Sequence, residues 1–220
     1  SRTQAIVSFK SNQVTQKVSN SYSGLNARNS RGQILSAHKA DTLVKALQRN
    51  FDRNYSAQAS VTATVKSAKV LKLDSSPLNH YGFKYKYEVN VDNLISEEKG
   101  VYQIDIDEFF SHNIRYVTNA KNRFLDYHVP FLGTDKEEVI FVFEKETTLT
   151  NAAELNQKLE NDYASYEFKV TQLKPNMIRI QSSYQLKQLF ISKDKVQELD
   201  KVNQIFIDLR DQKFLFKEKS

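Results

Sequence analysis

The chain has 220 residues, carries a formal net charge of +6, and is 40% hydrophobic and 26% charged. With only five glycines and three prolines, this composition is typical of a folded globular protein and excludes a mainly disordered or collagen-like chain. The absence of cysteine excludes disulfides, thiolate metal sites and a cysteine nucleophile. The length is enough for one large domain or two ordinary ones.

No run of about 18 apolar residues occurs, so we expect no membrane span. The first twenty residues alternate polar and apolar side chains without the hydrophobic region of a signal peptide. Because the sequence begins at Ser1 rather than at a methionine, we expect a processed chain or a fragment of a longer protein.

The positive charge is concentrated near the N-terminus. Residues 1–60 contain nine basic and two acidic side chains, whereas the remaining 160 residues are close to neutral. A solvated face is the favoured explanation of such a surplus, and the alternative is a surface that meets an acidic neighbour, such as another domain, an anionic polysaccharide or nucleic acid. The basic residues that would form this surface are Arg28, Arg31, Lys39, Lys45, Arg49 and Arg53.

The first half of the chain alternates strand and helix patterns. Two short strands are predicted on either side of residues 11–13, ending at Ser23-Gly24. A helix is predicted over residues 36–53, with Ser36 as its N-cap. Its apolar residues recur at helical spacing at Ala40, Leu43, Val44, Leu47 and Phe51.

Period-two alternation follows this helix. It begins near Ala59, and its phase slips near Ser67, which predicts a β-bulge. The clearest strand is residues 83–92, where five large apolar side chains alternate with polar ones. Residues 102–106 continue the pattern, and the polar stretch 118–123 indicates a domain boundary.

The second half predicts further strands and two helices. The predicted strands are 124–131, 139–143, 166–170, 178–191 and 213–217, with a turn at 174–176. The predicted helices are a short one that follows Thr150 and carries Ala152, Leu155, Leu159 and Tyr163, and a terminal one capped by Ser192.

Many half-buried strands and few helices predict a mainly β or α+β fold rather than a parallel doubly wound sheet. We expect two β-sandwich-like antiparallel domains, residues 1–120 with the helix 36–53 and residues 121–220 with the C-terminal helix.

No nucleotide-binding, hydrolase or metalloprotease motif occurs. The four histidines, at positions 38, 80, 112 and 128, lack the spacing of a metal site. Asp105-Ile106-Asp107-Glu108 is the densest carboxylate cluster, but a polar strand face explains it better than a calcium site, because the glycine turn of a calcium loop is missing. We therefore predict no catalytic, cofactor-binding or metal-binding residues.

Other charged and aromatic residues also have simple structural interpretations. Glu97-Glu98 and Glu137-Glu138 are interpreted as solvated turn charges. The eleven tyrosines and fourteen phenylalanines lie mostly at alternating strand positions, which favours burial in the cores over base stacking. Nucleic acid is therefore disfavoured as a partner.

Several segments together resemble a known family. They are residues 23–28, the amphipathic helix, Asn122-Arg123 leading to Val129-Pro130-Phe131, and the terminal helix followed by a strand. The chain resembles the C-terminal β-domains of bacterial, Bacteroidetes-type transglutaminase-like envelope proteins. The cysteine, histidine and aspartate of that family's catalytic core belong to a domain that this sequence does not contain. The resemblance implies a non-catalytic end of a larger periplasmic or extracellular protein.

Three functional hypotheses follow. The first is a non-catalytic binding or structural module, accessory to a transglutaminase-like domain, whose partner is a neighbouring domain of the same protein or an envelope protein or glycan. The second is a scaffold domain of an envelope secretion or conjugation machine. The third is a binder of anionic polymers through the basic N-terminal third.

Overall fold

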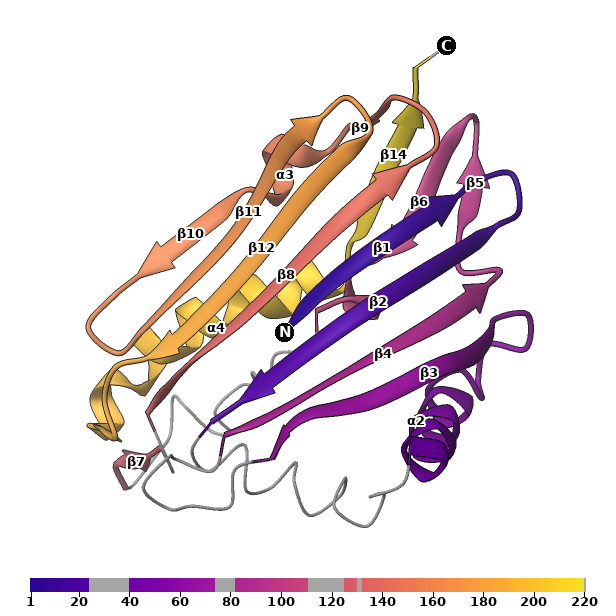
Figure 1. Ribbon diagram of the computed structural model, residues 1–220. Coiled ribbons are helices and arrows are strands. Elements are labelled where there is room, and N and C mark those ends of the chain that lie inside the picture. Colours follow the sequence, from indigo (N-terminus) through magenta and orange to yellow (C-terminus); the bar gives the residue numbers. More distant parts are fainter. Residues whose placement is uncertain (24–39, 74–81, 111–124, 130–131, 220) are drawn as a thin grey trace. The chain divides into compact units, whose positions relative to one another are not determined.

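The computed structural model describes residues 1–23, 40–73, 82–110, 125–129 and 132–219 (Figure 1). The chain divides into two compact units. Unit 1 comprises Ser1–Ser96 with Ile140–Glu144, and unit 2 comprises Glu97–Val139 with Lys145–Ser220. The boundary predicted at residues 120/121 lies outside the described residues and stays a prediction.

Unit 1 is built on an antiparallel sheet. Its strand order is β1 (Arg2–Ser8), β2 (Gln13–Tyr22), β4 (Phe83–Asp92) and β3 (Thr62–Leu73). The predicted hairpin at residues 11–13 joins β1 and β2. The register of β3 against β4 shifts between Val65 and Ser67, which confirms the predicted bulge.

One face of this sheet is covered by helix α2 (Ala40–Asn54), which lies beside β3 in Figure 1. Leu43 of the helix is buried, and Val65, Val89 and Val91 of the strands form a buried cluster with Tyr55 just after the helix. The alternation in β4 places its apolar residues on this face, as the sequence predicts. The first residues of the predicted helix, 36–39, lie outside the described part of the chain.

Aromatic rings line the same face. Phe83 and Tyr85 stack at 5.3 Å between ring centroids, and Tyr85 and Tyr87 at 6.1 Å. Tyr22 of β2 joins this stack, and Phe51 of α2 contacts the edge of Tyr87 at 6.0 Å. Burial raises the pKa of the Tyr85 and Tyr87 hydroxyls. These rings therefore belong to the core.

Among the described residues, unit 2 contains strands of three sheets and a long helix. One sheet has the order β5 (Ser96–Glu98), β6 (Val101–Asp105), β14 (Lys213–Glu218) and β9 (Thr147–Leu149). A second contains β10 (Gln157–Glu160), β11 (Ala164–Lys174) and β12 (Met177–Leu186), followed by β8 (Gly133–Phe143). The third is the pair β13 (Phe190–Ile191) and β7 (Tyr127–His128). The ring of Phe110 lies 5.1 Å from Phe168 of β11 and 6.4 Å from Phe214 of β14, so it links the first two of these sheets. The helix α4 (Val196–Arg210) packs on β11, where Phe206 meets Tyr166 edge-on at 5.8 Å.

The remaining described elements of unit 2 are the short helices η2 (Ile106–Glu108), α3 (Ala152–Leu155) and η4 (Lys193–Lys195). The first residue of β5 and the last residues of β8 belong to unit 1. The described pairings are antiparallel. The mainly β class is therefore confirmed, as are the C-terminal helix and the closing strand.

The short helix predicted after Thr150 is wrong beyond Leu155. Residues 157–160 form strand β10, which pairs with β11. Asn156 ends the helix, because its side-chain amide donates to Ala152 O at 2.7 Å and its Oδ1 accepts from Val170 N at 2.8 Å. Pairing with a neighbouring strand therefore overrides the helical spacing of the apolar residues.

Two predicted strands are also shorter than expected. Within 124–131, the described strand is only β7, and the strand predicted over 178–191 is interrupted at residues 187–189. Lys187 N still donates to Tyr163 O at 2.9 Å, which continues the register of β11 and β12 by one residue. Beyond this point Leu189 O accepts from Val129 N at 2.8 Å, so the chain bonds to the residues that follow β7 instead of to β11.

The interpretation of Glu137-Glu138 as solvated turn charges is also wrong. Both residues lie within β8, and Glu137 is only 8% exposed. Glu137 lies two residues before Val139 in β8, and Val139, Phe141 and Phe143 are buried at every second position, so Glu137 lies on the same buried face of the strand. Glu138 is half-buried and accepts a hydrogen bond from Gln181 Nε2 at 3.2 Å.

Candidate functional site

The six basic residues proposed from the sequence divide into two groups. Arg28, Arg31 and Lys39 lie outside the described residues. Lys45, Arg49 and Arg53 are exposed on α2 at a spacing of four residues. The spacing puts them along one side of the helix. A shallow hollow of about 400 Å³ beside this side is lined by Thr42, Lys45, Gln48 and Arg49.

The structure brings together a second group of basic residues on the sheet of unit 1. They lie on the face opposite to α2. In the register, Ser19 of β2 is the partner of Lys86 of β4, which is in turn the partner of Lys69 of β3. One step along the strands, Glu88 of β4 is the partner of Lys17 on one side and of Ser67 on the other. We call these six residues the basic sheet face.

The basic sheet face is accessible. Five of its six side chains are exposed and Glu88 is half-buried. They line a hollow of about 540 Å³ that extends across three strands, together with the intervening residues Val18, Ala68 and Tyr87. Side chains from three strands that are far apart in the sequence therefore border one surface.

Two lysines of this face are direct cross-strand partners. Lys69 and Lys86 lie opposite each other on neighbouring strands, which are about 4.8 Å apart in a sheet. Like charges in this position destabilise a sheet. In the next part of the register, Lys72 is the Cα partner of Lys84. An anion bound between such lysines would relieve their repulsion.

The lysines of this face differ from those of unit 2. In unit 2, lysines pair with carboxylates, as Lys187 does with Glu160 at 2.7 Å and Lys201 with Glu198 at 2.7 Å. Within the part of the chain that the structure describes, no ion pair joins Lys17, Lys69 or Lys86 to a carboxylate. Their ammonium groups are therefore available to a ligand.

The net charge of unit 1 also favours an anionic ligand. Its residues include fourteen basic and six acidic side chains, a balance of +8, whereas unit 2 has eighteen basic and twenty acidic ones. The formal charge of the chain therefore comes from unit 1. A positive unit attracts anionic ligands over a distance comparable to the Debye length, about 8 Å at physiological ionic strength.

This surface could not be predicted from the sequence, because its members are scattered from position 17 to position 88. The available signal was the alternation of lysines with aromatic residues in Phe83-Lys84-Tyr85-Lys86-Tyr87. Alternation assigns the lysines to one face of a strand. It does not say which other strands lie beside it.

The carboxylate cluster at Asp105–Glu108 is not a flat strand face. Asp105 ends β6, and Asp107 lies in the 3₁₀ helix η2. Partial burial, and then the neighbouring charge of Asp105, raise the pKa of Asp107. Lys213 Nζ lies 3.6 Å from Asp105 Oδ1. Across the described ranges there is no group of three or more His, Asp or Glu side chains arranged to bind a metal ion.

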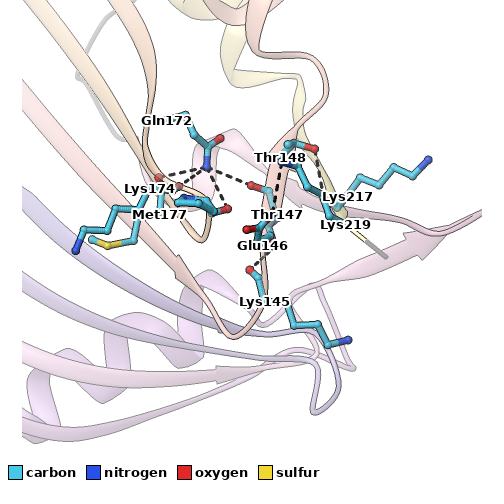
Figure 2. Close-up of polar contacts among 10 residues, drawn as sticks. Lys145, Glu146, Thr147, Thr148, Gln172, Lys174, Met177, Lys217 and Lys219 are labelled. Atoms are coloured by element: carbon cyan, nitrogen blue, oxygen red, sulfur yellow. Dashed lines mark hydrogen bonds and ion pairs between the residues drawn. The ribbon is translucent and has the colours of Figure 1, made fainter.

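Figure 2 shows a second polar cluster, at one end of unit 2. The side-chain amide of Gln172 donates to Lys174 O at 2.7 Å and to Thr147 O at 3.2 Å. Thr147 N in turn donates to Pro175 O at 2.9 Å. These bonds fasten the turn between β11 and β12 to β9. Since the amide is already bonded to main-chain carbonyls, the cluster is a structural junction rather than a binding site.

The lysines around this junction are partly neutralised. Lys145 Nζ lies 3.1 Å from a Glu218 oxygen and Lys219 Nζ lies 3.5 Å from a Glu146 oxygen. The lysines of the basic sheet face have no such partners among the residues that the structure describes, so this face is the stronger candidate for binding an anion.

Buried hydroxyl groups in unit 2 are also structural. Tyr166 Oη and Ser182 Oγ are 2.9 Å apart, and Tyr184 Oη donates to Asn203 Oδ1 at 2.9 Å. Burial raises the pKa of both tyrosines. Groups of this kind stay protonated at neutral pH, so they act as neutral hydrogen-bond donors inside the core.

Comparisons with family models, with curated proteins and with solved structures gave no match to this chain. The resemblance to transglutaminase-like envelope proteins therefore stays a prediction. Among the described residues, no helix combines the length and the apolar composition needed to cross a bilayer.

Proposed function

We propose that this chain is a non-catalytic binding module that holds an anionic polymer on the basic sheet face. The observation that carries the proposal is the cross-strand pair Lys69 and Lys86, which lies beside an open hollow of about 540 Å³. No carboxylate among the described residues forms an ion pair with either lysine. Such a pair disfavours the empty state and favours the state with an anion bound.

The expected binding is electrostatic. Each cation that contacts a polyanion releases condensed counterions, so the affinity falls as salt rises. With Lys17, Lys69 and Lys86 as the contacts, the slope of log affinity against log salt is about −2 to −3. The charge of +8 on unit 1 would accelerate the encounter at low ionic strength.

The wider setting of the module remains part of this proposal. The resemblance implies a larger bacterial envelope protein with a transglutaminase-like domain, located in the periplasm or outside the cell. An anionic glycan of the envelope is a partner that fits both this setting and the basic sheet face. No specific observation on the described residues favours the scaffold alternative.

A double substitution tests the site. In the variant Lys69→Gln with Lys86→Gln, affinity for a labelled heparin oligosaccharide should fall about tenfold or more at about 20 mM salt. The matched control is Lys45→Gln with Arg49→Gln on α2, which removes the same charge and should reduce affinity no more than about threefold. Fluorescence anisotropy over a salt series measures both the affinity and the slope.

A stability measurement accompanies the binding experiment. Because the double substitution on the sheet removes a repulsive pair, its free energy of unfolding should equal or slightly exceed that of the original chain. Lost binding in a less stable protein would point to unfolding instead. Absence of heparin binding by the original chain, or an equal loss in both variants, would refute the proposed site.

A further inference from the structure

We infer that the anionic polymer is a polysaccharide that bears carboxylate or sulfate groups as well as free hydroxyls, rather than a nucleic acid or a polyphosphate. This inference rests on the proposed function and concerns the same six residues. Three features of the basic sheet face support it: the position of the aromatic rings, the interleaving of hydroxyls with lysines, and the carboxylate of Glu88.

The aromatic rings of β4 lie on the face of the sheet opposite to the lysines, where they cannot stack against bases bound at the basic sheet face. Phe83, Tyr85 and Tyr87 alternate along β4 with the lysines, and all three rings contact one another or α2. Sequence-tolerant binding of single-stranded nucleic acid relies on bases stacked against exposed aromatic side chains. The six residues of the basic sheet face include no aromatic ring, so this face lacks the platform that such a ligand needs.

Hydroxyl groups alternate with cations on the two outer strands of the hollow. Along β2, Lys17 is followed two residues later by Ser19, and along β3, Ser67 is followed by Lys69. All four side chains are exposed, and successive outward residues of a strand are about 6.6 Å apart. A ligand that alternates charged groups with hydroxyls would find a cation and a hydrogen-bonding hydroxyl on each strand.

Glu88 stands between these two strands and discriminates between ligand classes. It is the partner of Lys17 in β2 and of Ser67 in β3. No hydrogen bond or ion pair joins its carboxylate to another described side chain. A carboxylate accepts hydrogen bonds from sugar hydroxyls. A chain of phosphate groups offers no donor and is repelled.

The magnitudes decide which effect dominates for each ligand. A hydrogen bond to a charged acceptor contributes more than a neutral one, whereas repulsion between exposed charges is weakened by water and salt. For a polysaccharide, Glu88 therefore strengthens binding in spite of the net charge. For polyphosphate only the repulsion remains, and for nucleic acid the repulsion of the many phosphates outweighs the few N–H donors of the bases, so Glu88 weakens binding.

The test is the single substitution Glu88→Gln, measured with three probes of matched length: a polygalacturonate oligosaccharide, inorganic polyphosphate and oligo(dT). Affinity for polygalacturonate should fall about threefold or more, because the charged acceptor is lost. Affinity for polyphosphate and oligo(dT), where binding is detectable, should rise. The opposite sign of these changes separates the ligand classes within one protein variant.

A second variant, Ser19→Ala with Ser67→Ala, leaves the charge unchanged. It should weaken polygalacturonate binding about threefold or more and leave polyphosphate binding within a factor of two. Its far-UV circular dichroism and thermal unfolding should match those of the original chain, since both hydroxyls are exposed.

The outcomes distinguish this inference from the proposed function. If no probe binds at low salt, the proposed function is refuted and the inference with it. If polyphosphate or oligo(dT) binds at least as tightly as polygalacturonate, or if Glu88→Gln strengthens the binding of every probe, the site stands as an anion-binding surface and the polysaccharide assignment is refuted.

Discussion

Asn12 shows how a single residue connects distant parts of unit 1. It has a φ of 48°, in the left-handed region that asparagine tolerates better than most residues. Its main-chain O accepts from Asn93 N at 2.8 Å, and its Oδ1 accepts from Ile95 N at 2.9 Å. The turn after β1 is thereby joined to the end of β4.

The substitution Asn12→Ala should lower the free energy of unfolding by about 2 kcal/mol. It leaves the main-chain amide of the buried residue Ile95 without its acceptor, and alanine adopts the left-handed region less readily than asparagine does. Asn12→Asp is the control, since it keeps both an acceptor and the conformational tolerance. Urea denaturation measures both. Equal losses in the two variants would contradict the assigned role of the side chain.

At the scale of secondary-structure elements, Gln48 joins helix α2 to β3, the edge strand of the sheet in unit 1. Its Nε2 donates to Ala63 O at 2.7 Å and its Oε1 accepts from Val65 N at 2.8 Å. The side-chain amide therefore occupies the positions that a neighbouring strand would use. Edge strands with unpaired main-chain groups promote aggregation, and this contact covers part of the edge of β3.

The substitution Gln48→Leu should speed hydrogen exchange at the Val65 amide about tenfold or more, because that amide loses its acceptor. Sedimentation velocity should also show more self-association at high concentration. Asp52→Ala is the matched control: it removes the other partner of the Gln48 amide, at 2.8 Å, and leaves the two bonds to β3. Unchanged exchange at Val65 in Gln48→Leu would show that the contact is not maintained in solution.

At the scale of the whole molecule, the core of unit 1 depends on a segment that is distant in sequence. Residues 140–144 belong to unit 1 although they follow the whole first segment of unit 2, Glu97–Val139. Phe143 is 3% exposed, and its ring lies 5.5 Å from that of Phe9. The N-terminal 96 residues therefore do not contain all of the core of unit 1.

The substitution Phe143→Ala in the full chain should lower the free energy of unfolding by about 3 to 5 kcal/mol, as expected for removal of a buried ring. Phe190→Ala is the control, because Phe190 is 67% exposed, and it should change stability by less than about 1 kcal/mol. Thermal and urea unfolding measure both. A small effect at Phe143 would mean that residues 140–144 are not essential to the core.

Local patterning predicted the elements whose own side chains decide their structure. The strand at 83–92, the bulge at Ser67 and the C-terminal helix were all found, because alternation and helical spacing reflect which side of an element is buried. The prediction failed at residues 157–160, where pairing with β11 determines the conformation. It also failed at Glu137, since burial of a charged residue depends on its neighbours in space.

The sequence by itself therefore determined the mainly β class, the amphipathic faces of the strands and helices, and the excess of positive charge in the N-terminal part. Only the tertiary structure decided which charges share a surface. Lys17, Lys69 and Lys86 come together because strand register, which depends on pairing between distant segments, sets the neighbours of each residue. A linear pattern gives the face of a strand on which a lysine lies, whereas the binding surface is created by the strands beside it.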